Sequence, residues 1–110
     1  MDKYVFDKNK VHLHNIVYAI TSPEDYEMQR LLLLTDMPDT NADYVLVEGS
    51  HCSCYNFDET EWEAFDYTAE ELVKLLRNVD EFCDPLRVKL KNFLKYYDNY
   101  FKKAFEKKGE

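Results

Sequence analysis

One histidine and two of the three cysteines lie within four residues, in the stretch from Gly49 to Tyr55 that reads Gly-Ser-His-Cys-Ser-Cys-Tyr. Thiolate sulfur and imidazole nitrogen are the ligands that zinc prefers. Three cysteines cannot all pair within one chain, and Cys52 and Cys54 are too close in sequence for an unstrained disulfide. The cluster therefore predicts part of a structural zinc site in which every ligand comes from the protein.

The third cysteine supplies a further ligand in this hypothesis. Cys52 and Cys54 are two residues apart, so in an extended segment their side chains face the same way. Cys83 lies at the start of a predicted helix, and a helix N-terminus stabilises a thiolate. His51 is the fourth candidate, although it requires the chain to leave strand geometry, for which Gly49 offers the freedom. The predicted metal ligands are His51, Cys52, Cys54 and Cys83.

Two alternatives to this ligand set stay open. His12 or His14 could replace His51 if the face that carries them looked toward the cysteines. The three cysteines could instead be buried free thiols that act as small apolar residues.

The elements that must position these residues begin with strands. Residues 4–6 and 11–20 are rich in β-branched and aromatic residues, and Tyr44–Glu48 is the clearest strand signal, leading directly into the cluster. Ser22 followed by Pro23 and two acids predicts a helix that runs to about Arg30. Residues 31–34 are four leucines that fit either a buried helix end or a buried strand.

The second half of the chain predicts one more strand and two helices. Alternating apolar residues predict a strand over 61–67, and a capping box at 68–71 predicts a helix that ends near Asn78. From Pro85 to Phe105 an apolar stripe at helical spacing predicts one long helix. The expected fold is a single α+β domain over residues 1–110, with an antiparallel sheet of three or four strands packed by a short capped helix and a long C-terminal helix.

Charge is distributed unevenly along the 110 residues, whose formal net charge is −8. Residues 58–84 carry 10 acidic and 2 basic side chains, whereas residues 85–110 carry 3 acidic and 8 basic ones. An acidic surface of this density repels nucleic acid and attracts the basic surfaces with which other proteins hold DNA or RNA. The alternative is a solvated surface that serves solubility.

Other functional classes find little support in the sequence. It contains no Gly-rich phosphate loop, Gly-x-Ser-x-Gly elbow or His-Glu-x-x-His motif, so we expect no enzyme activity and name no catalytic residue. No apolar run approaches the roughly 20 residues that span a bilayer, and the N-terminus lacks the apolar stretch of a signal peptide. We expect a cytoplasmic protein that binds neither membrane nor nucleic acid directly.

The stretch from Val45 to Tyr55, followed by Phe57, Trp62 and the helix start at residues 67–72, resembles a group of small bacteriophage proteins that share a Gly-Ser-His-Cys-Ser-Cys-Tyr core. The resemblance covers about residues 44–76. In size and acidity the chain also resembles type II-A anti-CRISPR proteins of streptococcal phages. That second resemblance implies binding to Cas9 and a block of guide or target loading in the host bacterial cytoplasm.

The resulting expectation is an anti-CRISPR protein whose acidic surface faces the nucleic-acid channel of Cas9, or of another nucleic-acid-binding defence protein. Two alternatives from other classes are a thiol- or metal-dependent redox or hydrolytic enzyme that uses the cysteine cluster, and a phage accessory interaction protein without a defence target. The expected partner-binding residues are Asp58, Glu59, Glu61, Glu63, Asp66, Glu70 and Glu71.

Overall fold

The computed structural model describes residues 2–22, 27–52 and 61–106, and at residues 27, 28, 50–52 and 61 it describes the backbone alone. The chain forms two compact units, Met1–Thr68 and Ala69–Glu110, which we call the sheet unit and the helical unit. Together they confirm the α+β class. The single domain remains a prediction, and each unit is described by itself.

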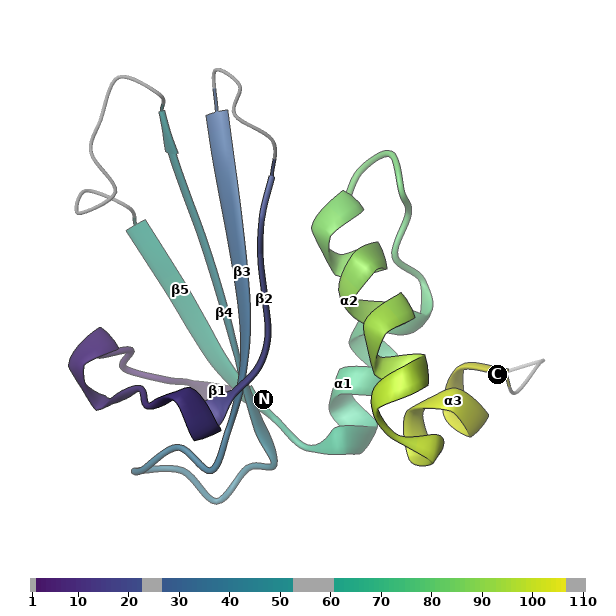
Figure 1. The fold of residues 1–110 in the computed structure, drawn as a ribbon, viewed down its shortest axis with the longest axis horizontal. Helices are drawn as coiled ribbons and strands as arrows, with labels where there is room; N and C mark the ends of the chain where they lie inside the picture. Colours follow the sequence, from purple (N-terminus) through teal and green to yellow (C-terminus); the bar gives the residue numbers. More distant parts are fainter. Residues whose placement is uncertain (1, 23–26, 53–60, 107–110) are drawn as a thin grey trace. The chain divides into compact units, whose positions relative to one another are not determined.

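The sheet unit contains an antiparallel sheet of five strands, one or two more than expected (Figure 1). The order across the sheet is β1-β5-β4-β3-β2, so the first strand of the chain pairs with the last. The strands are β1 (Asp2–Lys3), β2 (Ile16–Thr21), β3 (Glu27–Thr35), β4 (Tyr44–Cys52) and β5 (Glu61–Tyr67).

The predicted helix is wrong over residues 27–30, because β3 starts at Glu27 and each of its residues to Thr35 has a partner on β4. Residues 23–26 lie outside the described part of the chain. Ser22, the predicted N-cap, bonds to β3. Its hydroxyl oxygen accepts a hydrogen bond from the Gln29 N–H at 2.9 Å, and its own N–H donates to the Gln29 carbonyl at 2.8 Å. Pairing across the sheet therefore overrides the local capping signal, and the leucines at 31–34 belong to a strand.

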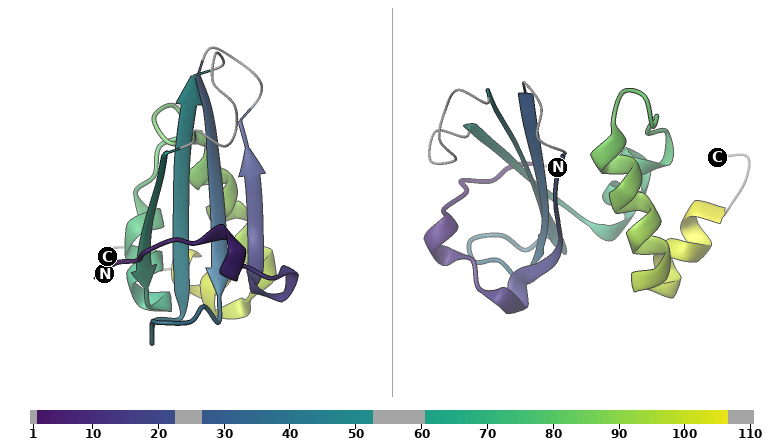
Figure 2. Two further views of the ribbon diagram at one scale, coloured as in Figure 1. Left: turned by 90° about the vertical axis from the view of Figure 1, so that its left-hand side faces the viewer. Right: turned by 45° about the horizontal axis from the view of Figure 1, so that its top comes forward.

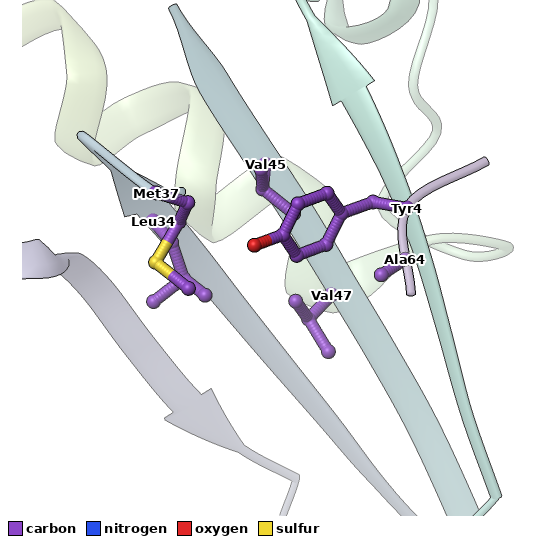
Figure 3. Close-up of a cluster of buried hydrophobic side chains, with 6 residues drawn as sticks. All are labelled: Tyr4, Leu34, Met37, Val45, Val47 and Ala64. Carbon is purple, nitrogen blue, oxygen red and sulfur yellow. The ribbon is translucent and has the colours of Figure 1, made fainter. Parts of the chain in front are cut away.

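A buried apolar cluster lies on one face of the sheet (Figure 3). Alternate residues of β3, β4 and β5 form its floor, and residues of the N-terminal segment and of the loop after β3 cover it. Phe6 and Trp62 extend the cluster, with ring centroids 5.6 Å apart. Its buried members are Tyr4, Leu34, Met37, Val45, Val47 and Ala64.

The N-terminal segment crosses this face before the chain enters β2 (Figure 2). It contains two short 3-10 turns, Lys8–Lys10 and Leu13–Asn15, so the strand expected from residue 11 begins only at Ile16. The reason is Asn15, which is only 2% exposed. Its side-chain oxygen accepts from the His12 N–H at 3.0 Å, and its amide donates to the carbonyls of Thr35 at 2.8 Å and Asp36 at 3.3 Å.

The helical unit consists of α1 (Ala69–Arg77), α2 (Pro85–Tyr97) and α3 (Asn99–Glu106). The prediction of a single long C-terminal helix is therefore wrong, because α2 ends at Tyr97 and α3 begins at Asn99. Asp98 has extended backbone angles and ends α2, and its carboxylate accepts a hydrogen bond from the Tyr100 N–H at 2.9 Å. An aspartate in this position is a preferred N-cap, so the chain starts a new helix instead of continuing the old one.

Lys91 of α2 connects all three helices of this unit. Its ammonium group donates to the Arg77 carbonyl at the end of α1, at 3.2 Å, and lies 5.4 Å from the centroid of the Phe105 ring of α3. Burial, followed by the charges of Lys95 and Arg77, lowers the pKa of Lys91. None of the described helices is both long enough and apolar enough to cross a bilayer.

Candidate functional site

The backbone around the cysteine cluster differs from the expected one. Gly49 does not turn the chain out of β4, because the strand continues through His51 to Cys52. Gly49 instead stands between Arg30 on β3 and Trp62 on β5. A glycine inside a strand often marks a close approach of a neighbouring group, and the register places Gly49 opposite the large residue Trp62. The bend that would let His51 and Cys52 share one ion is therefore not present at Gly49.

The other two predicted ligands lie elsewhere. Cys54 is outside the described residues. Cys83 belongs to the helical unit, in the turn before α2, and its side chain is exposed, so it is not the buried apolar thiol of the alternative hypothesis. A hydrogen bond to Asp80, together with the charge of that carboxylate, raises the pKa of the Cys83 thiol. This direction is opposite to the thiolate stabilisation expected from the helix N-terminus.

His12 and His14 lie close to each other and far from the cluster. Their rings are parallel within 4°, with centroids 5.6 Å apart. Ile16, which follows them, is in register with Leu34, and Leu34 with Val45, seven residues before Cys52 on β4. Seven strand residues span about 23 Å. That distance excludes both histidines as ligands of an ion held by Cys52.

In the described part of the chain, no three or more His, Cys, Asp and Glu side chains gather as they would around a metal ion. The zinc site thus depends on Cys54 and on the side chains of His51 and Cys52, which lie outside the part of the chain that the structure describes. It stays a prediction.

The acidic residues expected to bind a partner are distributed over both units. Asp58 and Glu59 are outside the described residues, and Glu61 is the first residue of β5, in register with Ser50 on β4. Glu63 is exposed on β5 and stands in register with Glu48 on β4. Sequence reasoning missed Glu48, because only the strand register shows that it stands opposite another glutamate.

Asp66 has a different role from the one expected. One carboxylate oxygen accepts from the Asp2 N–H at 2.7 Å, and the other accepts from the Thr40 hydroxyl at 2.9 Å. It also lies two strand positions from Ala64, on the face of the buried cluster, whereas Glu63 lies on the opposite face. Asp66 therefore holds the N-terminus and the loop after β3 to the sheet.

The last two acidic residues occupy the first turn of α1, where a negative charge is favoured by the helix dipole. Glu70 is exposed and lies 3.6 Å from the ammonium group of Lys74 one turn later. Glu71 is half-buried. Asp66 and Glu63 thus lie on opposite faces of the sheet, and of the seven predicted residues Glu63 and Glu70 have exposed, described side chains.

A groove between α1 and α3 is a further feature of the helical unit that the sequence patterns did not reveal. Its volume is about 390 Å³, and three cations and one carboxylate line it, so it is positive in a strongly acidic protein. The sequence feature that could have indicated this groove is the presence of basic residues in the last turns of both helices, Lys74 and Arg77 in α1 and Lys103 in α3. The lining residues are Glu70, Val73, Lys74, Arg77, Tyr100, Lys103 and Ala104.

In comparisons with known proteins, no family model, curated protein or solved structure matches the chain.

Proposed function

We propose that the chain is a bacteriophage inhibitor that binds Cas9, or another nucleic-acid-binding defence protein, and keeps nucleic acid out of its basic channel. The proposal combines the sequence resemblance with the excess of acidic residues between positions 58 and 84. Carboxylates that face a basic channel compete with the phosphates that normally occupy it. The protein itself needs no catalytic group for this action.

The observation that carries the proposal is the placement of Glu63 opposite Glu48 on neighbouring strands. Like charges directly opposite each other lower the stability of a sheet. Two carboxylates brought together by the strand register concentrate negative charge at one place on the sheet, which supports attraction to a basic partner. The contact residues that we propose are Glu63 and three acidic residues that precede it in the sequence, Asp58, Glu59 and Glu61.

Two structural observations support a smaller contact surface than the full set of seven acidic residues. Asp66 is occupied by two hydrogen bonds within the sheet unit, and we leave it out. Glu70 and Glu71 belong to the helical unit, where Glu70 is paired with Lys74. We therefore expect replacements in β5 to weaken inhibition more than replacements in the first turn of α1.

Charge reversal tests this surface. With Asp58, Glu59, Glu61 and Glu63 all changed to lysine, we expect inhibition of DNA cleavage by purified Cas9 to be lost. Glu63→Lys alone should weaken binding by about tenfold, or about 1.4 kcal/mol. Glu106→Lys is the matched control, because Glu106 is an exposed acid at the end of α3. Full inhibition by the fourfold variant would reject the acidic surface and direct attention to the basic groove between α1 and α3.

We also propose that a structural zinc ion supports the fold, with Cys52, Cys54 and Cys83 as ligands and His51 as the fourth candidate. The support is the clustering of zinc-preferring side chains in the sequence. Elemental analysis of the purified protein should find one zinc per chain, and a chelator should lower the melting temperature strongly. Serine at any one of the three cysteines should reduce the zinc content. A metal-free protein whose melting does not respond to chelator would reject the site.

A further inference from the structure

The basic groove between α1 and α3 is built from one face of each helix. Residues 70, 73, 74 and 77 form its α1 wall, and residues 100, 103 and 104 form its α3 wall. These positions are three and four residues apart, so each set lies on a single face of its helix. All of the lining residues belong to the helical unit.

The groove carries a net positive charge. Lys74 and Arg77 line one wall, Lys103 lines the other, and Glu70 is the single carboxylate, so three cations and one anion leave a net charge of +2. Glu70 lies 3.6 Å from Lys74, but the two side chains are 75% and 69% exposed. An ion pair this exposed contributes little, so it does not prevent Lys74 from binding another anion. Acidic residues elsewhere are screened beyond about 8 Å at physiological salt, so the local cations determine what the groove attracts.

The end of α1 would by itself oppose an anion, because the last carbonyl groups of a helix carry partial negative charge. Arg77 is the last residue of α1, and its carbonyl accepts a hydrogen bond of 3.2 Å from the ammonium group of Lys91. Lys91 does not line the groove, so it supplies positive charge at the helix end without occupying space between the walls. This bond reduces the repulsion that an anion would meet there.

Apolar and aromatic groups complete the lining. Val73 is buried, Ala104 is half-buried, and Tyr100 is 47% exposed. The Tyr100 ring packs edge-on against the buried Phe101, with centroids 5.4 Å apart and planes at 81°. The volume of about 390 Å³ is within the range of sites that hold small molecules. The groove therefore combines cations for a negatively charged group with an aromatic surface for a flat ring.

We propose that this groove binds a nucleoside monophosphate, with the phosphate between the cations of the two walls and the base against the ring of Tyr100. A phosphate monoester carries about −1.5 to −2 charges at pH 7, which complements the net +2 of the lining. Bases of every kind stack on aromatic side chains. Because the groove is open to solvent on its exposed side chains, we expect a dissociation constant on the order of 100 μM.

This binding site is independent of the proposed inhibition of Cas9. Glu63 and the other three contact residues proposed above do not line the groove, and its test uses the purified chain without Cas9. Loss of one activity therefore leaves the other open to measurement.

Variants with one cation removed from either wall test the phosphate contact. Lys74→Gln and Lys103→Gln keep the length of the side chain, and both lysines are exposed, so the fold should persist. Lys102→Gln is the matched control, because Lys102 is an exposed neighbour on α3 that does not line the groove. Tyr100→Ala removes the stacking surface. Circular dichroism verifies that each variant is folded.

Titration of the full chain with adenosine monophosphate up to about 5 mM, followed by NMR, measures binding. Amide signals of residues 70–77 and 100–104 should shift and saturate. Lys74→Gln, Lys103→Gln and Tyr100→Ala should each weaken binding at least about fivefold, and Lys102→Gln less than about twofold.

Adenosine, inorganic phosphate and a glutamate-rich peptide identify the occupant. Adenosine and phosphate should each bind at least about tenfold more weakly than adenosine monophosphate, since each makes only one of the two contacts. Equal binding of either would overturn the proposal, and so would a peptide that displaces adenosine monophosphate at lower concentration, because the occupant would then be an acidic protein segment. Absence of saturable shifts, or a folded Lys103→Gln variant that binds like the wild type, would also overturn it.

Discussion

The sheet unit and the helical unit are held together over very different distances along the chain. In the sheet unit, polar side chains connect segments that are far apart in sequence: Tyr4 bonds to Pro38, 34 residues away, and Asp66 to the Asp2 N–H, 64 residues away. In the helical unit, the Asp98 carboxylate bonds only two residues ahead, and Lys91 reaches back 14 residues to Arg77.

The difference in sequence separation indicates which interactions stabilise each unit. A sheet with a non-local order needs specific side chains that fix where distant segments cross, and these side chains are polar because they bond to backbone groups. A helical unit brings its apolar side chains together by local periodicity, so that a few large rings carry much of its stability. Trp62, the only tryptophan, lies in the sheet unit, so its fluorescence follows that unit while far-ultraviolet circular dichroism follows the helices.

The largest effect is expected from Phe101→Ala in the helical unit. Phe101 is 1% exposed, and the centroid of its ring lies 6.1 Å from that of Phe105 and 5.4 Å from that of Tyr100. Removing a buried ring leaves a cavity, so we expect the free energy of unfolding to fall by about 4 kcal/mol. Urea denaturation followed by circular dichroism measures the change. Tyr96→Ala, at a side chain that is 92% exposed, should cost less than about 0.5 kcal/mol.

A loss of about 3 kcal/mol is expected from Asn15→Ala in the sheet unit, because the change removes three partly buried hydrogen bonds of a side chain that is itself buried. The Trp62 fluorescence transition in urea should move to lower denaturant concentration. Asn9→Ala is the matched control, since Asn9 is exposed in the first 3-10 turn. Equal stability of the two variants would mean that position 15 does not fix the crossing of the N-terminal segment.

Asp98→Ala should lower the stability of the helical unit by about 1 kcal/mol, because α3 loses the side chain that caps its first turn. Asp98→Asn should retain most of this stability, since asparagine also caps. Helix content by circular dichroism and urea denaturation measure the effect. If alanine at this position raised the stability, α2 and α3 would favour the continuous helix that the apolar stripe predicts.

The smallest effect at neutral pH, about 0.5 kcal/mol, is expected from Tyr4→Phe, which removes the hydrogen bond of 2.8 Å from the Tyr4 hydroxyl to the Pro38 carbonyl. Its signature lies in the pH dependence. Burial, and then the charge of Asp39, raises the pKa of Tyr4 above its ordinary value of 10.0. The folded protein therefore keeps this proton longer than the unfolded chain does. The contribution of Tyr4 is complete below about pH 10 and is lost as the pH rises further.

Unfolding free energies of the wild type and Tyr4→Phe between pH 8 and 11 isolate this effect. We expect the stability advantage of the wild type to shrink above about pH 10. Lys91, whose pKa is lowered, contributes the opposite slope to both proteins and cancels in the difference. A constant difference across the range would show that Tyr4 titrates alike in the folded and unfolded states.

Sequence patterns were informative where the structure depends on near neighbours. Alternation of apolar residues predicted β5 over its observed bounds, 61–67, and the capping signal at Thr68 preceded α1 as expected. The pattern at Ser22 failed because the pairing of β3 with β4 outweighs a local cap. At Asp98 the continuous apolar stripe favoured one long helix, although aspartate is itself a preferred N-cap and a new helix starts after it.

The candidate site was harder to predict than the fold. The role of Asp66 depends on Asp2 and Thr40, which lie 64 and 26 residues away, and no spacing in the sequence signals such a contact. The proximity of Glu48 and Glu63 depends on strand register in the same way. The prediction of a bend at Gly49 failed because the residue type alone does not distinguish a glycine inside a strand from a glycine at which the chain turns.

The pairing of β1 with β5 also determines the order in which the sheet unit can form. Asp2 leaves the ribosome before any other described residue, yet its partner Asp66 follows 64 residues later. Until then the N-terminal segment has no strand to join, and the apolar face formed by β3 and β4 stays without its complete cover. Closing so long a loop slows folding. We therefore expect the hairpin of β3 and β4 to form early, and the segment that contains β1 to be among the last to reach its native position.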